Sequence, residues 1–339
     1  MTRAESLAWR AARFGPHQDV LGLGPRPLPR AREGFVVIEV EAAGVNLPDV
    51  LMVAGDYQVR PEPPFTPGRE VVGRVVETAP GSSALLGRRV VARPSLPHGG
   101  YAEHTLARTQ DLFPLDEHMD AREAATLLVT YLTAHVALHH RACVRAGESV
   151  LVLGGAGGVG SAAIQIARAA GATVLATASG PERLAVCRDL GAHVAIDRVH
   201  DDLIEVVRDA SGGKGADVVI DPVGGDLFAV ARRALAWAGR AVLVGFASGS
   251  PPPLKANGIL LRNQSIHGLH LGPYQEHAPE VTQAAFRDLL RLHRSGGIKP
   301  LVSVVHPLGG VIDAMSAIKA GAVIGKIVID VRTTTTPKE

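Results

Sequence analysis

The sequence predicts an α/β protein in which a doubly wound parallel-sheet domain is inserted into a smaller β-rich domain. From residue 149 to 247, apolar strand-like runs alternate with helical runs, and most of these strands lack the alternation of a half-exposed strand. Before residue 120, short β-branched runs follow one another without helical spacing, and this style returns after residue 266. We therefore assign residues 1–120 plus 266–339 to the β-rich domain and 121–265 to the α/β domain, and expect the site in the cleft between them.

The β-rich domain is predicted from runs that are bounded by Gly and Pro. Residues 34–45 form the longest candidate strand, and residues 69–77, 87–94 and 99–107 form shorter ones. Two proline-loaded stretches are predicted to be surface loops, "GPRPLPR" (24–30) and "RPEPPFTPG" (60–68).

The α/β domain begins with a helical pattern at 120–144, for which Asp120 is a plausible N-cap with Glu123 three residues on. Strand and helix then alternate through "SVLVLGG", "GVGSAAIQIARAAG", "TVLATAS" and "PERLAVCRDLG". Further units follow, including a helix predicted over 226–239 before the strand "RAVLVGFAS".

Composition excludes several classes of partner. The chain has 339 residues with a formal net charge of +2, too small to suggest a nucleic-acid or membrane partner. Its two cysteines, Cys143 and Cys187, form no CxxC pair, so neither a disulfide framework nor a thiolate zinc cluster is expected. No run of about 18 apolar residues predicts a membrane span, and a cytoplasmic location is the expectation.

A glycine-rich turn indicates a dinucleotide site. Gly154, Gly157 and Gly160 lie between a strand and a helix, where glycines let backbone amides and the helix N-terminus approach a pyrophosphate. The flanking strand and helix and the βα units that follow supply the context that this motif requires.

The tip of the next strand favours NADPH over NADH. NAD sites usually carry Asp or Glu there, whereas this chain has Ser179 and Gly180, with Arg183 one helical turn on. Arg198 is a second candidate cation for a ribose phosphate. The alternative is that both arginines are simply solvated.

The motifs together resemble the zinc-independent quinone oxidoreductase branch of the medium-chain dehydrogenase/reductase superfamily. The likeness covers nearly the whole chain and is carried by "AAGVNLPDVLMVAGDY", "FTPGREVVGRVVE", "GGYAEHTL", "TYLTAHVAL", "VLVLGGAGGVG", "ATASGPERL", "DVVIDPVGG" and "GAVIGKIVI". It implies a GroES-like catalytic domain, a Rossmann domain and a homodimer.

The resemblance also implies that the catalytic zinc of related alcohol dehydrogenases is absent. Their three ligand positions are Asn46, Arg69 and Val129 here, and an amide, a guanidinium and an isopropyl group do not form a zinc shell. We predict no metal site, and take the paired histidines His139 with His140 and His267 with His270 as solvated or hydrogen-bonded.

Site residues follow from the same resemblance. Three catalytic positions are implied: Asn46 as a donor to a developing enolate or to the nicotinamide ribose, Tyr57 as a donor to the acceptor, and Thr133 beside the nicotinamide. From the residues alone, Asn46 is a turn residue, Tyr57 a packing residue and Thr133 a helix residue bonded to its own backbone. The implied cofactor contacts beyond the glycine turn are Gly158, Val159, Val223, Val244, Gly245, Phe246, His270, Leu271, Gly272 and Lys326, the last toward a phosphate.

Three functions remain open from the sequence. The first is an NADPH-dependent quinone oxidoreductase, because a quinone accepts hydride without a Lewis acid. The second is an NADPH-dependent reductase of enals, enones or enoyl thioesters. The third is a non-catalytic crystallin-like or RNA-binding role, which the intact glycine turn and the near-neutral charge disfavour.

Overall fold

The structure is a computed structural model that describes residues 5–252 and 254–333. It divides into two compact units, each described by itself: one combines the chain up to Val129 with the chain from Pro300 onward, and the other is Thr130–Lys299. The α/β unit therefore runs about 30 residues further than the expected boundary at 265. The reason is that residues 265–268 add an edge strand to its sheet and that the helix Pro279–Arg294 packs against residues 132–141 of the same unit.

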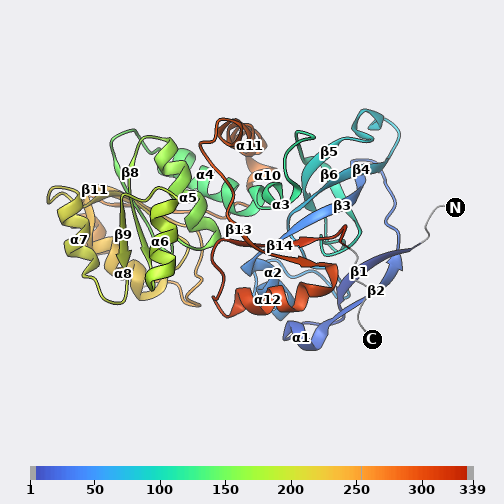
Figure 1. The fold of residues 1–339 in the computed structure, drawn as a ribbon, viewed down its shortest axis with the longest axis horizontal. Helices are drawn as coiled ribbons and strands as arrows, with labels where there is room; N and C mark the ends of the chain where they lie inside the picture. The colour runs from blue at the N-terminus through green and yellow to red at the C-terminus, as the bar shows by residue number, and fades with distance from the viewer. Residues whose placement is uncertain (1–4, 253, 334–339) are drawn as a thin grey trace. The chain divides into compact units, whose positions relative to one another are not determined.

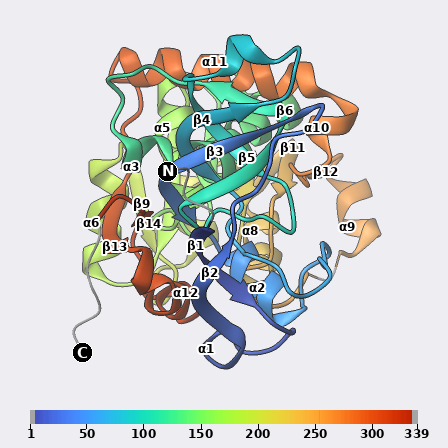
Figure 2. The same ribbon diagram turned by 90° about the vertical axis from the view of Figure 1, so that its right-hand side faces the viewer.

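The β-rich unit is built around a ring of four antiparallel strands (Figure 2). Strand β3 pairs with β4 and also with β6, and β5 joins β4 to β6, so the ring closes on itself. The strands of this unit are β1 (Glu5–Ala11), β2 (Leu21–Pro27), β3 (Phe35–Val45), β4 (Val71–Thr78), β5 (Arg89–Pro94), β6 (His104–Pro114), β13 (Val302–Pro307) and β14 (Lys326–Asp330). Its helices are α1 (His17–Val20), α2 (Leu47–Ala54), α3 (Ala121–Ala124) and α12 (Val311–Lys319).

Two features of this unit differ from the sequence prediction. Residues 24–27 of the first proline-loaded stretch belong to β2, which pairs antiparallel with β1 in a two-stranded sheet. A strand of a two-stranded sheet has one unpaired edge, where proline is tolerated. The strand predicted at 99–107 begins at His104, because Gly99 and Gly100 are taken up by a tight backbone crossing.

The α/β unit contains a six-stranded parallel sheet in the order β12-β11-β10-β7-β8-β9. Its alternation of strand and helix can be followed in Figure 1. The strands are β7 (Ser149–Val152), β8 (Thr173–Ala178), β9 (Val194–Asp197), β10 (Ala216–Asp221), β11 (Leu235–Leu243) and β12 (Ser265–Gly268). The helices are α4 (Leu132–His135), α5 (Gly158–Ala169), α6 (Pro181–Asp189), α7 (Leu203–Ala210), α8 (Gly225–Arg233), α9 (Ala256–Leu261), α10 (Tyr274–His277) and α11 (Pro279–Arg294).

Local signals account for several boundaries. Asp120 caps α3 as predicted, because its carboxylate accepts the N–H groups of Arg122 and Glu123. The helix predicted over 226–239 ends at Arg233, and residues 235–239 start β11 instead. Apolar Leu235 and Ala236 are buried in the sheet core, so tertiary packing overrides the helical pattern. None of the described helices is both long enough and apolar enough to cross a bilayer.

A buried ion pair joins distant parts of the chain within the β-rich unit. The Lys326 ammonium at the start of β14 lies 3.1 Å from a Glu70 carboxylate oxygen, and the two side chains are 3% and 0% exposed. The ammonium also donates to the Val45 carbonyl and to the Asn46 amide oxygen. The second Glu70 oxygen accepts the N–H of Val129 at 2.8 Å. These contacts satisfy both charges away from water.

We expect Lys326→Met to lower the free energy of unfolding by about 3–5 kcal/mol, because it leaves Glu70 buried without a counter-charge. The double variant Glu70→Gln with Lys326→Met should recover most of that loss, since no charge is then buried. Denaturant unfolding of the two variants measures the difference.

The exposed pair Arg74 with Glu117, whose side chains are 41% and 58% exposed, provides the matched control. Arg74→Met should lower the free energy of unfolding by less than about 1 kcal/mol. A loss for Lys326→Met no larger than that of Arg74→Met would show that the buried pair does not hold the unit together.

Candidate functional site

The predicted cofactor residues of the α/β unit meet at one edge of its sheet. Parallel registry pairs Val152 with Ala176 and Ile220, and Leu243 with Asp221 and Gly268. The strands therefore end level with one another, and the segments that leave them emerge side by side. The turn 154–160, the tip 179–180, Val223, the segment 244–246 and the segment 270–272 all follow strand ends at this edge. Ligands of open parallel sheets bind at this edge.

The glycine-rich turn requires glycine because neighbouring atoms leave no room for side chains. A Cβ on Gly160 would lie 2.1 Å from the Gly154 carbonyl oxygen, and a Cβ on Gly155 would lie 2.8 Å from the Cys187 sulfur. Gly154 adopts a φ of +62°, which glycine accepts without strain. The sequence pattern identified Gly154, Gly157 and Gly160 but passed over Gly155, whose constraint depends on Cys187 in α6.

Helix α5 presents unpaired amides at its first turn. The N–H groups of Gly158, Val159 and Gly160 have no hydrogen-bond acceptor among the described residues, as the geometry of a helix N-terminus dictates. Gly157 precedes the helix in an extended conformation. Bare glycines and three outward amides together fit a dinucleotide pyrophosphate, which would accept these N–H groups.

The tip of β8 carries both signs of charge. Arg198 follows β9 and donates from Nε to the Ser179 hydroxyl at 2.5 Å, as its predicted place beside the tip requires. Arg183 lies in the first turn of α6. Asp197, however, accepts the N–H of Val199, forms a hydrogen bond with the His200 ring and accepts the N–H of Gly180, and these contacts lower the pKa of its carboxyl. The tip is therefore not neutral as predicted, because β9 brings the Asp197 carboxylate beside it.

A buried carboxyl shapes the turn after β10. Asp221 is fully buried, and its Oδ1 accepts the N–H groups of Val223 and Gly224 at 2.7 and 2.8 Å. Burial raises the pKa of this carboxyl to about 6. Val223 is thus held with its side chain against Gly154, 3.0 Å from where a Cβ would lie. Asp221 was not predicted, although an Asp closing an apolar strand is the signal that identifies it.

Thr133 lies in α4 between two π-helical turns, Leu127–Tyr131 and Val136–Arg141. Its side chain is mostly buried, and its hydroxyl forms no hydrogen bond with any described residue. The alternative of a bond to its own helix backbone is therefore not what the structure shows. Widened helical turns of this kind occur frequently at functional sites.

In the β-rich unit the side chain of Asn46 is already engaged on every polar atom. Its amide nitrogen donates to Glu70 at 2.9 Å and to the Gly44 carbonyl at 3.3 Å, while its oxygen accepts from Lys326. Both amide protons are thus used, so a role as donor to an enolate would require one of these bonds to break. The geometry makes Asn46 a residue that organises the corner between β3 and α2.

Lys326 is not placed to meet a phosphate. All three of its N–H groups are taken by Val45, Asn46 and Glu70, and its side chain is 3% exposed. The predicted contact of Lys326 with a phosphate is therefore wrong, because its ammonium is enclosed within the unit. A lysine and a glutamate that each begin an apolar strand are the signal for a buried pair, and that signal was missed.

Tyr57 lies half-buried against the core of the β-rich unit. Burial raises the pKa of its phenol, which Arg69 lowers and Asp49 raises to smaller degrees. The phenol therefore keeps its proton at neutral pH and is able to donate it in a hydrogen bond. Tyr57 thus has the chemistry that its predicted role requires.

Asp49 and Tyr101 form a second buried polar group beside it. The Tyr101 hydroxyl and the Asn46 N–H both donate to Asp49 Oδ2, at 2.9 and 3.0 Å. Burial raises the pKa of this carboxyl to about 6, and its Oδ1 has no partner among the described residues. Neither residue was predicted, because no spacing in the sequence connects positions 49 and 101.

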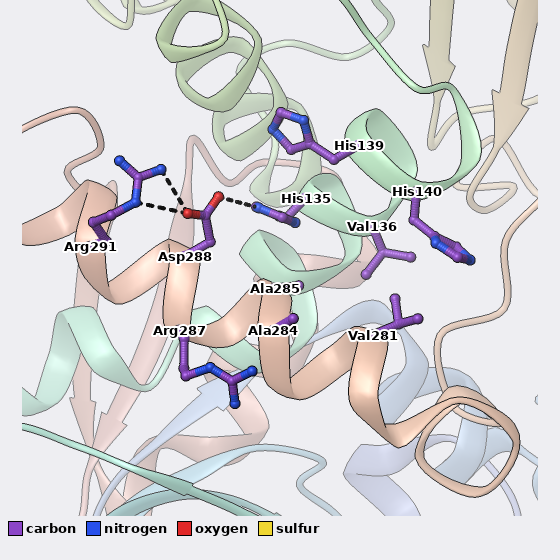
Figure 3. A pocket seen from close by; sticks show the side chains of 10 residues that line it. All are labelled: His135, Val136, His139, His140, Val281, Ala284, Ala285, Arg287, Asp288 and Arg291. Atoms are coloured by element: carbon purple, nitrogen blue, oxygen red, sulfur yellow. Dashed lines mark hydrogen bonds and ion pairs between the residues drawn. The ribbon is translucent and has the colours of Figure 1, made fainter.

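The α/β unit also has a surface pocket of about 600 Å³ between α11 and the helical segment 132–141 (Figure 3). Asp288 points between His135 and Arg291 and bonds to both, at 2.9 Å and 2.7 Å. None of the predicted site residues lines this pocket. Within the described part of the chain, no three His, Cys, Asp or Glu side chains are arranged to hold a metal ion.

Comparison with known proteins identifies both units. Residues 32–117 match the model of the alcohol dehydrogenase GroES-like domain, and residues 158–290 match the model named zinc-binding dehydrogenase. Quinone oxidoreductase-like protein 2 of Bos taurus is 37% identical, over 91% of this chain and 87% of its own. The quinone oxidoreductase of Homo sapiens is 32% identical, over 89% of this chain and 90% of its own.

Solved structures agree with these relatives. The quinone oxidoreductase of Thermus thermophilus, also solved in complex with NADPH, is 38% identical with a TM-score of 0.82, over 96% of this chain and 100% of that one. A mycobacterial protein complexed with NADPH is 30% identical with a TM-score of 0.87, over 96% and 99% of the two chains. The chain therefore belongs to the quinone oxidoreductase branch of the medium-chain dehydrogenase/reductase superfamily, and is an oxidoreductase with a GroES-like and a Rossmann unit.

Proposed function

We propose that this protein is an NADPH-dependent quinone oxidoreductase that works without zinc. The observation that carries the proposal is the bare glycine turn with three unpaired amides at the start of α5, within a chain of this branch. The Thermus and mycobacterial neighbours, each described in complex with NADPH, support the cofactor. NADPH, when bound, supplies a hydride.

The α/β unit binds the cofactor with backbone groups rather than with charged side chains. The amides of Gly158, Val159 and Gly160 hold the pyrophosphate, and the turn fixed by Asp221 presents Val223 beside it. Thr133 and the segments 244–246 and 270–272 orient the nicotinamide. Arg183 and Arg198 hold the ribose phosphate at the tip of β8.

The β-rich unit positions the acceptor and supplies the donor to its oxygen. The residues at the three zinc-ligand positions do not fit a metal. Asn46 and the backbone of Val129 are bound to Glu70, whose charge Lys326 already neutralises, and Arg69 is a cation. Tyr57 instead donates a hydrogen bond to the acceptor oxygen on which negative charge develops.

A homodimer is the proposed assembly. Strand β12 is an edge strand of the parallel sheet. Leu260 and Leu261 shortly precede it in the chain, and Trp237 lies in β11, the strand that pairs with it. Trp237, Leu260 and Leu261 are 71%, 76% and 77% exposed, which is unusual for a surface without a partner. A monomeric mass by light scattering at micromolar concentration would contradict this assembly.

A panel of acceptors tests the activity. Quinones, enals and enoyl thioesters are offered with NADPH, and the loss of NADPH absorbance is followed. Quinone reduction with the highest kcat/KM supports the proposal, whereas a clear preference for enals or enoyl thioesters favours the second candidate, which shares the fold.

NADPH should bind more tightly than NADH, since two cations flank the tip of β8. Arg183→Glu should weaken the binding of NADPH by about 1.5–3 kcal/mol, because one charge-assisted bond to a phosphate is lost. The affinity for NADH should stay nearly unchanged. Asp197→Asn should strengthen NADPH, because it removes the carboxylate beside the tip. Calorimetric titration with both cofactors measures these effects, and equal wild-type affinity for the two would refute the assignment.

Tyr57→Phe should separate the two candidate reactions. The reduction of a quinone is driven by the electron affinity of the quinone itself. We therefore expect kcat/KM for quinones to fall less than about tenfold. An enal or enoyl thioester forms a localised enolate, for which loss of a preorganised donor costs about 2.7–4 kcal/mol. If kcat/KM falls by the same factor for both acceptor classes while the melting temperature is unchanged, Tyr57 is a packing residue.

A further inference from the structure

Arg69 is a cation to which the structure gives no counter-ion. Its guanidinium makes no hydrogen bond and no ion pair with any residue that the structure describes, although its side chain is partly buried. By contrast, Arg89 of the same unit is bound to Glu41 at 2.9 Å, and Arg26 donates to Thr66. A guanidinium has five N–H donors, and burial without acceptors is costly.

The backbone that carries Arg69 is held on both sides. On one side, the Gly68 carbonyl accepts the N–H of Gly100 at 3.0 Å, and Gly68 has a φ of +106° with no room for a Cβ. On the other side, Glu70 is fixed in the buried pair with Lys326. Arg69 therefore projects from a rigid turn rather than from a flexible loop.

Positive charge gathers around this turn. Strand β4 pairs with β5 so that Val71 faces Ala92, which brings Arg93 next to the turn that precedes Val71. Burial, and to a smaller degree the charge of Arg69, lowers the pKa of Arg93 to about 10, while the charge of Asp111 raises it.

None of the carboxylates that the structure describes forms an ion pair with Arg69. Glu70 is paired with Lys326, and Asp111 is paired with Arg108 at 2.7 Å. Asp49 attracts Arg69 but forms no ion pair with it, and its Oδ2 already accepts two hydrogen bonds. An anion beside Arg69 would supply the counter-charge that its guanidinium lacks, because opposite charges attract strongly at a site with little water.

Tyr57 belongs to the same group of side chains, since the charges of Arg69, Asp49 and Arg93 all act on its phenol. Tyr57 is also the donor that we assign to the acceptor oxygen. The cationic turn and the acceptor thus share one site.

We propose that Arg69, supported by Arg93 and Tyr57, recognises an anionic group on the acceptor, so that the enzyme prefers quinones that carry a carboxylate or a sulfonate over neutral quinones. This inference rests on the proposed function and specifies its substrate class. Arg69 is a specificity-determining residue that binds the anionic substituent through N–H donors. It takes no part in the transfer of the hydride.

The test compares naphthoquinone with naphthoquinone sulfonate in the wild-type protein, in Arg69→Gln and in Arg88→Gln. Arg88 is an exposed arginine of the same unit and serves as the matched control. We expect Arg69→Gln to lower kcat/KM for the sulfonate at least about tenfold, mostly through KM, because a charge-assisted bond is lost. In Arg69→Gln, kcat/KM for the neutral quinone should change less than about threefold. In Arg88→Gln, kcat/KM should stay unchanged for both quinones.

A second measurement does not depend on turnover. Naphthalene sulfonate, titrated into the NADPH-loaded protein in a calorimeter, should bind the wild type at least about tenfold more tightly than Arg69→Gln. Its affinity should fall as salt is added. The inference would be overturned if Arg69→Gln lowered kcat/KM equally for both quinones. It would also be overturned if naphthalene sulfonate bound the wild type and Arg69→Gln with equal affinity. If neither quinone is reduced but the sulfonate binds as expected, the proposed function fails and the anion site stands.

Discussion

The β-rich unit depends on one ion pair that water does not reach. Glu70 and Lys326 lie 256 positions apart in the chain, and their charges are compensated by each other and by a few polar groups of the same unit. Those groups are Asn46, Val45 and Val129, which belong to separate segments of the chain. One satisfied pair therefore fixes the start of α2, the turn before β4 and the start of β14 at the same time. It also occupies the residues that would otherwise be free to take part in metal binding.

The α/β unit depends on a different constraint, the level ending of six parallel strands. Registry alone brings the glycine turn, the charged tip and the segments after β10, β11 and β12 to one edge. The chemistry at this edge is mostly backbone chemistry, with unpaired amides at α5 and a turn held by Asp221. Side chains matter chiefly where they exclude other side chains, as Cys187 does at Gly155.

The sequence predicted those features whose signal is local. The strand at 34–45, the cap at Asp120 and the glycine turn each depend on neighbouring residues, and the structure confirms their placement. The roles of Asp49 and Tyr101 depend on a contact between distant segments, which no spacing in one sequence reveals. The strand in the proline-loaded stretch at 24–27 was not predicted for a related reason. It forms by pairing with β1, which is a contact between separate segments of the chain. The expected boundary at 265 differs from the division of the structure because β12 is too short to carry a pattern of its own.

We propose that hydride passes from NADPH to a quinone in a site organised by Glu70 and Lys326 and not by a metal. Turnover of a neutral quinone by the full-length protein after exhaustive chelation, with metal content determined on the same sample, tests it most directly. We predict undiminished turnover with no stoichiometric zinc, since an amide, a guanidinium and an isopropyl side chain occupy the three ligand positions. Turnover that is lost on chelation and restored by zinc would contradict the account.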